Sequence, residues 1–202
     1  MAENKCRRLR IGTNLTLCLI VAIGFVIGRL TAPDEIITRI NTVEVPTNAS
    51  LPETGDVAYF DIPLSHSLQE YIYEICAEEN VPVTLAMAMI EHESGFNPEV
   101  VSSTDDYGLM QINVINHEQL EEQYRCADMT DPYQNVFCGI KIIGSYIEKY
   151  EGDISKALMA YNMGDYGAVK AWEEGITSTG YSEKILALMR TYEEELSDAD
   201  GK

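Results

Sequence analysis

The chain has 202 residues, of which 46% are hydrophobic, and a formal charge of −19 at pH 7. This length suits one modest globular domain with additional segments. The acidic balance excludes a nucleic-acid backbone as the expected partner, because the phosphates and the protein would repel each other.

The N-terminal part has the pattern of a membrane anchor. Residues 1–10 form a basic segment, and the apolar segment 11–31 carries no charge before Arg29. About twenty helical residues span about 30 Å, the thickness of a bilayer core. Basic residues ahead of such a segment favour the cytoplasm for the N-terminus. We expect a transmembrane signal anchor rather than a cleaved signal peptide, because no clear cleavage site follows the apolar run.

Two further segments flank the expected domain. Residues 32–64 contain four prolines and show weak periodicity, which is typical of a flexible stalk outside the membrane. Residues 65–192 carry helical patterns and form the predicted domain. Residues 193–202, with five acidic side chains, are expected to be a solvated tail. The predicted topology is a single-pass protein of the cell membrane with an extracytoplasmic domain.

The domain is predicted to be all-α. Ser67 to Glu70 has the pattern of a capping box before an amphipathic helix. The next helix, 83–93, is apolar nearly all round and is therefore expected at the centre of the domain, with Gly95 ending it. We find no alternating strand pattern of any length.

Three more helices follow in the second half of the domain. Asp131 and Pro132 are typical of a helix start, and the apolar stripe behind them ends at Gly152. Asp153 is expected to cap a shorter helix that ends near Gly164, and a last helix spans about 182–196.

Cysteines and histidines limit the other chemistry. Cys126 and Cys138 lie in the part expected outside the membrane, where they form either a disulfide, worth about 3 kcal/mol, or two buried free thiols. The three histidines do not form an HExxH pattern, and no phosphate-binding or dinucleotide fingerprint occurs. We therefore expect no metal and no cofactor.

Glu93 is the first candidate for catalysis. It lies at the C-terminal end of the apolar helix, where burial and the helix dipole both raise the pKa of a carboxyl group. Such a group can protonate a glycosidic oxygen near neutral pH. Glu91 competes with it, and the pattern alone separates the two glutamates poorly.

Four short motifs connect this candidate with a known family. In chain order they are ESGF (93–96), GLMQIN (108–113), AYN with a following glycine (160–164) and a lone Tyr181. Together they resemble the lysozyme-like domain of soluble-type lytic transglycosylases, and DPYQN…GI (131–140) resembles the next helix of that domain. The resemblance covers about residues 65–190. It implies a lysozyme-like catalytic domain behind the anchor and stalk, with Glu93 rather than Glu91 as the catalytic acid.

The resemblance also implies the substrate-binding residues. Two polar side chains would orient the sugar or the acid, one glycine would let the backbone approach the sugar, and two apolar residues would wall the groove. An alanine, two tyrosines and an asparagine would flank the acid or hold the acetamido group. These positions are Ser94, Gln111, Gly108, Leu109, Met110, Ala160, Tyr161, Tyr181 and Asn162.

The reaction that the resemblance implies takes place on peptidoglycan glycan strands. Glu93 would protonate the oxygen of the β-1,4 bond between N-acetylmuramic acid and N-acetylglucosamine, and the product would be a 1,6-anhydro sugar. The predicted partners are these strands and the cytoplasmic membrane. An anchored enzyme of this kind could also serve an envelope-spanning secretion or conjugation apparatus.

One stretch departs from the family pattern. STDDYGLMQIN (103–113) is also similar to STDYGILQIN of animal-type lysozymes, in which the aspartate before Tyr-Gly is the second catalytic carboxylate; Asp106 matches that position. The chain could thus be a hydrolytic muramidase that uses Glu93 and Asp106. Alternatively, Asp105 and Asp106 only cap a turn. A third hypothesis is a non-catalytic glycan-binding module.

Overall fold

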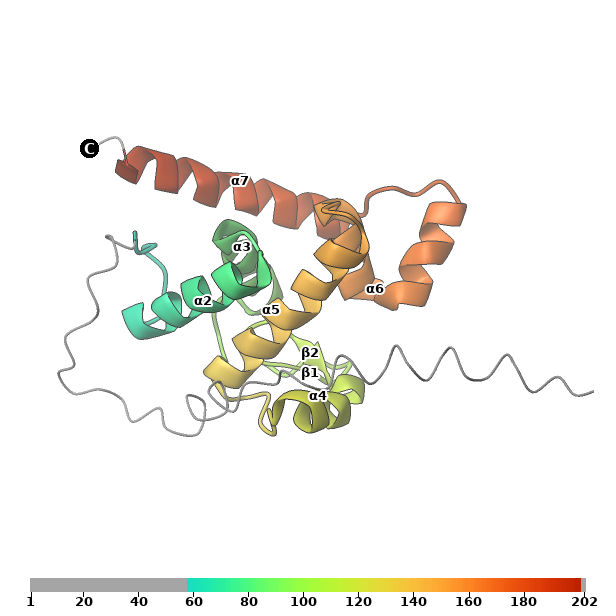
Figure 1. Cartoon of the computed structure of the whole chain (residues 1–202), viewed down its shortest axis with the longest axis horizontal. Helices are drawn as coiled ribbons and strands as arrows, with labels where there is room; N and C mark the ends of the chain where they lie inside the picture. Colours follow the sequence, from blue (N-terminus) through green and yellow to red (C-terminus); the bar gives the residue numbers. More distant parts are fainter. Residues whose placement is uncertain (1–57, 201–202) are drawn as a thin grey trace, which may run out of the picture. The chain divides into compact units, whose positions relative to one another are not determined.

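The structure is a computed structural model and describes residues 58–200 (Figure 1). The predicted basic segment, the anchor and the stalk up to residue 57 lie outside the described residues. Within the described part, no helix has both the length and the apolar composition needed to cross a membrane.

The described chain is mostly helical, as the sequence predicts. The helices are α2 (His66–Glu79), α3 (Val83–Ser94), the 3-10 helix η1 (Val114–Asn116), α4 (His117–Tyr124), α5 (Pro132–Lys149), α6 (Ile154–Glu173) and α7 (Gly180–Asp200). The two short strands are β1 (Asp106–Tyr107) and β2 (Ile112–Asn113), which pair antiparallel. This hairpin was not predicted, because strands of two residues are too short to show an alternating pattern.

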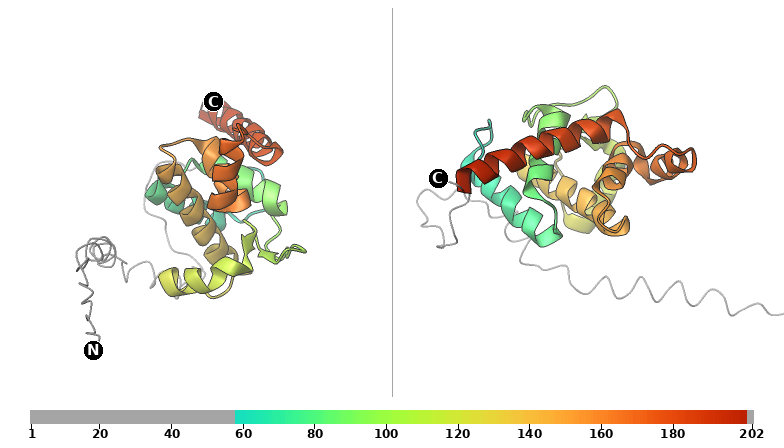
Figure 2. Two further views of the ribbon diagram at one scale, coloured as in Figure 1. Left: turned by 90° about the vertical axis from the view of Figure 1, so that its right-hand side faces the viewer. Right: turned by 90° about the horizontal axis from the view of Figure 1, so that it is seen from above.

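Helix α3 lies at the centre of the core, as its composition predicts. Every residue from Thr84 to Ile90 is buried. Helix α7 packs against α3, and α5 packs against both α2 and α6; Figure 2 shows α7 (red) lying across α3 (green). Gly95 ends α3 with a left-handed φ of 57°, and its N–H donates to the carbonyl of Glu91. The central helix therefore ends at Ser94, one residue after Glu93.

Side-chain caps start α2, α5 and α6. Asp131 accepts from the N–H of Gln134 ahead of α5, and Asp153 accepts from that of Lys156 ahead of α6, which confirms both predicted starts. The cap of α2 is Ser65 and not the predicted Ser67, since the Ser65 side chain accepts from the N–H of Leu68.

Helix α6 is interrupted where the sequence predicts its end. Gly164 adopts φ 72° and ψ 161°, a backbone conformation that breaks the helical path and favours glycine. A second helical part then continues to Glu173. The interruption divides the helix into two parts (Figure 1). Residues 160–163, just before the break, line the cavity described below.

The packed unit extends beyond both predicted boundaries. Phe60 and Leu64, assigned to the stalk, are buried. The side chain of Gln69 on α2 binds the N–H and carbonyl of Phe60 and the carbonyl of Leu64. At the other end, α7 stays helical through most of the predicted tail, since glutamate is a good helix former. Tyr192 on this helix packs edge-on against Phe60, with 5.1 Å between the ring centres.

The predicted alternatives for Cys126 and Cys138 are resolved in favour of free thiols. Both residues are buried and unbridged, so the disulfide is not formed. The Cys126 thiol lies 3.7 Å from the carbonyl of Tyr124. A hydrogen bond with Cys138 lowers the pKa of Cys126 and raises that of Cys138. The two thiols are therefore joined in the core by a hydrogen bond and not by a covalent bond.

Candidate active site

A cavity of about 840 Å³ lies among α3, the β1–β2 hairpin, α4, α5 and the first half of α6. Its volume falls in the range of small-molecule and glycan sites. Glu93 and Asp106, the two carboxyl groups that the sequence singles out, both line it. The structure therefore brings together two candidates that are 13 positions apart in the sequence.

Glu93 has the environment of a proton donor. Burial raises the pKa of its carboxyl group to about 7, a hydrogen bond from Tyr181 works against this rise, and the negative charge of Asp106 adds to it. The Tyr181 hydroxyl, from the start of α7, donates to Oε1 of Glu93 at 2.5 Å. Near neutral pH a large fraction of Glu93 is therefore a neutral acid facing the cavity, in agreement with the expected pKa rise.

Glu91, the competing glutamate, lies elsewhere. Two residues along a helix correspond to a rotation of about 200°, so its side chain leaves α3 on the side away from Glu93. Oε2 of Glu91 accepts a hydrogen bond from the Tyr192 hydroxyl at 2.6 Å. It lines a separate pocket beside Asp61 and Thr191. The geometry thus separates two glutamates that the sequence pattern leaves similar.

Asp106 has the opposite electrostatic character. Burial by itself opposes ionisation of this carboxyl group, but three hydrogen bonds outweigh burial and lower its pKa. Oδ2 accepts from the hydroxyls of Ser102 at 2.7 Å and Thr104 at 2.5 Å, and Oδ1 accepts from the side-chain amide of Asn113 at 2.8 Å. Asp106 is therefore an ionised carboxylate whose two oxygens are already engaged by donors.

Gln111 lines the cavity and also braces its loop. Its side-chain amide donates to the carbonyls of Val100 at 3.1 Å and Gly108 at 2.9 Å, and its backbone has a left-handed φ of 46°. These bonds tie the hairpin turn to the segment before it. Gln111 is thus placed both to hold the loop and to contact a ligand.

Gly108 packs closely against the start of α5. It is absent from the cavity wall. A Cβ atom on it would lie 2.4 Å from Nδ2 of Asn135 and 2.5 Å from the carbonyl oxygen of Met129, and its φ is 75°. The close approach of Asn135 and Met129 and the left-handed backbone therefore require a glycine here, and the implied approach of a sugar stays a prediction.

Four other predicted residues also lie outside the cavity wall, and one of them is Tyr181, which reaches the site through its hydrogen bond to Glu93. Leu109 and Met110 are fully buried in the core, because the loop turns both side chains inward. The Ser94 hydroxyl donates to the carbonyl of Ile90, one turn back on its own helix, at 3.0 Å. The side chains of Leu109, Met110 and Ser94 thus lie away from the cavity, and their implied contacts with a sugar stay predictions.

Asn135 is a residue that the sequence reasoning missed. This fully buried side chain accepts from the N–H of Met110 at 2.8 Å and donates to the carbonyls of Tyr107 at 2.8 Å and Met129 at 2.9 Å. It thereby fixes the hairpin loop to α5. An amide beside Val136 in the apolar stripe of a helix was the signal that could have revealed it, since a buried amide needs partners.

The first half of α6 forms another wall. Ala160, Tyr161 and Asn162 all line the cavity, as the resemblance implies. The Tyr161 hydroxyl donates to the carbonyl of Met110 at 2.8 Å, and burial raises the pKa of this hydroxyl, with the charge of Glu93 adding to the rise. Tyr161 thus remains a neutral donor that supports the loop. Tyr181, and not Tyr161, is the tyrosine that contacts Glu93.

Several lining residues are not among the predicted site residues, because their approach to the cavity depends on how separate loops, strands and helices pack. They include Ser102, Asn113, Ile115, Gln119, Gln123, Tyr124, Lys141, Ser145, Tyr146 and Met163. Among the residues that the structure describes, no three histidine, cysteine or carboxylate side chains gather closely enough to hold a metal ion.

We expect Tyr181→Phe to move the alkaline limb of the pH–activity profile upward by about one pH unit. The lost hydroxyl stabilises the charged form of Glu93, so its removal raises the Glu93 pKa and keeps the acid protonated to higher pH. The measurement is kcat/KM against pH. Tyr192→Phe, which loses the matching bond to Glu91, is the control and should leave this limb in place. An unchanged limb in Tyr181→Phe would contradict the assigned coupling.

Fold and site together define a class. A neutral glutamic acid and an ionised aspartate share one cavity in a helical domain with a small hairpin, an arrangement suited to acid-catalysed cleavage of glycosidic bonds. Residues 70–185 match the Transglycosylase SLT domain family, and the chain belongs to this family.

Two curated proteins are similar to part of this chain. Protein IpgF of Shigella flexneri and that of Shigella sonnei are each 34% identical over 91 residues, which is 42% of this chain and 59% of the relative. The match thus spans about three fifths of the length of these curated relatives.

Solved structures agree with the fold. An inactive mutant of the lytic transglycosylase Slt from Pseudomonas aeruginosa matches with a TM-score of 0.57 and 17% identity. The 70 kDa soluble lytic transglycosylase Slt70 of Escherichia coli matches with a TM-score of 0.58 and 19% identity. Each comparison covers 67% of this chain and 25% of the other. At such identities the likeness shows the fold alone, and it agrees with the predicted lysozyme-like architecture.

Proposed function

We propose that the chain cleaves the β-1,4 bond between N-acetylmuramic acid and N-acetylglucosamine and forms 1,6-anhydromuramic acid. The observation that carries this proposal is Glu93, a carboxyl group with a pKa of about 7 in the wall of a glycan-sized cavity. A general acid works best when its pKa is close to the ambient pH. Glu93 meets this condition.

The first step is protonation of the glycosidic oxygen by Glu93. The bond to C1 of the muramoyl residue breaks, and the N-acetylglucosamine leaves with the proton on its oxygen. The acetamido oxygen of the muramoyl residue itself stabilises the positive charge at C1. In the second step Glu93, now a carboxylate, accepts the proton of the C6 hydroxyl while O6 attacks C1. One enzymatic carboxyl group therefore acts as acid and then as base.

Asp106 is assigned an electrostatic role in this scheme. A carboxylate that already accepts three hydrogen bonds is a weak nucleophile, because attack on C1 would require it to give up donors. Its fixed negative charge can still stabilise positive charge at C1. The same charge raises the pKa of Glu93. Asp106 thus supports the acid without forming a bond to the sugar.

The mass of the released muropeptides tests the proposal. We expect products lighter by one water than those of a hydrolase, and no incorporation of label when the digestion is run in H₂¹⁸O. We expect Asp106→Asn to lower kcat/KM by about tenfold, the effect of losing one charge near C1, and to give the same anhydro product.

A hydrolytic muramidase is the second candidate, because Asp106 lies in the same cavity as the acid. For hydrolysis in H₂¹⁸O, the muramic acid at the new reducing end would carry ¹⁸O. It also requires that Asp106→Asn lose several orders of magnitude in rate, since the aspartate would be the nucleophile. Either result would replace the anhydro-forming scheme.

A further inference from the structure

Two reciprocal hydrogen bonds fix the backbone at the start of α7, where Tyr181 lies. The N–H of Thr179 donates to the hydroxyl oxygen of Ser182 at 2.9 Å, and the N–H of Ser182 donates to the side-chain oxygen of Thr179 at 3.3 Å. Ser182 is fully buried. These bonds hold the main chain on both sides of Tyr181, but they do not set the direction in which its ring points.

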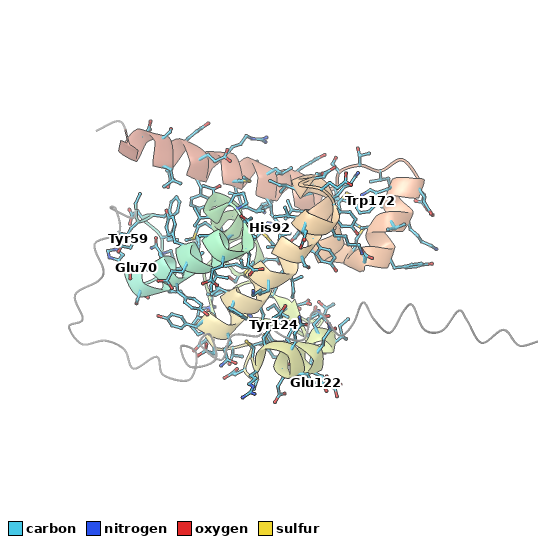
Figure 3. The ribbon with its side chains drawn as sticks, in the orientation of Figure 1. Tyr59, Glu70, His92, Glu122, Tyr124 and Trp172 are labelled. Carbon is cyan, nitrogen blue, oxygen red and sulfur yellow. The ribbon has the colours of Figure 1, made fainter. Side chains whose placement is uncertain are left out.

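The ring of Tyr181 packs against a second ring, that of His92. His92 lies on α3 directly before Glu93, and Figure 3 labels it. The two ring centres are 5.2 Å apart and the ring planes are inclined by 70°, an edge-to-face geometry that aromatic rings favour. The Tyr181 hydroxyl in turn donates to Glu93. The contacts thus run from His92 on α3 to Tyr181 on α7 and back to Glu93 on α3.

His92 acts on its neighbour through its ring and not through a charge or a hydrogen bond. Its Nδ1 atom is buried and has no hydrogen-bond partner among the residues that the structure describes. Burial and the positive charge of Lys184 on α7 both lower the pKa of the imidazole, so the ring is mostly neutral near pH 7. A polar atom that is buried without a partner costs free energy, which the packing of the ring must offset.

We propose that His92 is a positioning residue for the proposed reaction: its ring keeps Tyr181 turned so that the hydroxyl donates to Glu93. The hydroxyl lies at the far end of the tyrosine side chain, so a modest rotation about χ1 carries it out of hydrogen-bond range. The His92 ring hinders this rotation. The inference rests on the proposed function, since the strength of Glu93 as an acid matters only if Glu93 is the proton donor.

A double-mutant cycle tests this role, because it measures how far two side chains act through each other. The readout is the rise in the Glu93 pKa that Tyr181→Phe causes. With His92 present, we expect about one pH unit. In His92→Ala we expect about half of that or less, because the hydroxyl already leaves Glu93 part of the time. Asp106, which also shifts this pKa, is the same in every variant.

The measurement is an NMR titration of the full chain with ¹³C-labelled glutamate, in which Glu93→Gln identifies the Glu93 carboxyl signal. The alkaline limb of kcat/KM against pH gives the same shift independently. Comparing the effect of Tyr181→Phe between the two backgrounds cancels any change in hydration that His92→Ala causes by itself. Equal shifts in the two backgrounds would overturn the proposal.

Two further substitutions separate the ring of His92 from its nitrogen atoms. His92→Phe keeps a ring but has no nitrogen, and with it Tyr181→Phe should again shift the pKa by about one unit. His92→Asn keeps a polar group but has no ring, and it should behave like His92→Ala. The reverse order would overturn the proposal, since a nitrogen of His92 and not its ring would then act on Tyr181.

His66 provides the matched control. Its ring stacks on that of Tyr59 with 4.0 Å between the centres, and the Tyr59 hydroxyl donates to Glu70. The same three residue types therefore meet outside the cavity; Figure 3 shows Tyr59 and Glu70 well away from His92. His66→Ala should leave the full effect of Tyr181→Phe in place. A reduction as large as that in His92→Ala would reflect a general loosening of the domain and would overturn the proposal.

The titration also separates this inference from the proposed function. If the Glu93 pKa responds as expected but Glu93→Gln keeps its lytic activity, the proposed function fails, while the control of Tyr181 by His92 stands. If Glu93→Gln is inactive and the two backgrounds give equal shifts, the acid is correctly assigned and the role of His92 fails.

Discussion

Glu93→Gln is expected to reduce the lytic activity by about a thousandfold or more. Glutamine has nearly the same shape but cannot donate a proton to the glycosidic oxygen or recover one from the C6 hydroxyl. The neutral side chain can still occupy the cavity wall beside Tyr181. The measurement is the rate of release of muropeptides from purified peptidoglycan, with the fold checked by circular dichroism.

The same variant has an expected effect on stability, and its sign follows from the pKa. The folded pKa of Glu93, about 7, lies above its ordinary value of 4.5. Between these values the unfolded carboxyl group ionises first, so the free energy of unfolding falls as the pH rises and the loss is complete above pH 7. Glutamine avoids this loss. The Tm of Glu93→Gln should exceed that of the wild type at pH 8 and equal it at about pH 4.

Glu91→Gln is the matched control for both measurements. It changes a carboxyl group on the same helix that accepts from Tyr192 and lines a different pocket. Activity should stay close to that of the wild type. If Glu93→Gln retained full activity, the chain would use another acid or bind glycan without cleaving it, and the non-catalytic hypothesis would be preferred.

Asn135→Ala is expected to lower the free energy of unfolding by about 3 kcal/mol or more. The substitution leaves the N–H of Met110 and the carbonyls of Tyr107 and Met129 without their buried partner. For a domain of this size the loss corresponds to a fall in Tm of about 10 °C. Activity should fall as well, because the same bonds hold the loop between Asp106 and Gln111.

The neighbouring Gln134→Ala provides the comparison. Gln134 accepts a single exposed hydrogen bond, from the N–H of Asp128 at 3.1 Å, so its removal should change the Tm by only a few degrees. Equal melting temperatures for the two variants would show that the buried amide of Asn135 does not stabilise the loop.

The helices could be predicted because their signals are local. The apolar run of α3, the caps Asp131 and Asp153 and the break at Gly164 each depend on residues a few positions apart. The α7 boundary was harder to place, since the contact of Tyr192 with Phe60 joins distant parts of the chain. The same holds for the start of the domain.

The candidate site could be predicted only in part. The motifs identified Glu93 and Asp106 as candidates, but they did not predict which side chains of the loop point toward the cavity. Left-handed backbone at Gly108 and Gln111 directs Gln111 to the cavity and leaves Met110 in the core. Lys141 and the other cavity-lining residues of α4 and α5 were not found, because they share a cavity with Glu93 only through the packing of separate helices.

The position of Tyr181 at the start of α7 has a practical consequence for anyone who divides this protein. The hydroxyl that adjusts the acid strength of Glu93 comes from 88 residues further along the chain, on the helix that also covers α3. A fusion or truncated version must therefore keep the final helix intact. Without this helix, α3 would lose its packing partner and Glu93 would lose the hydrogen bond that lowers its pKa, even though every earlier motif would remain.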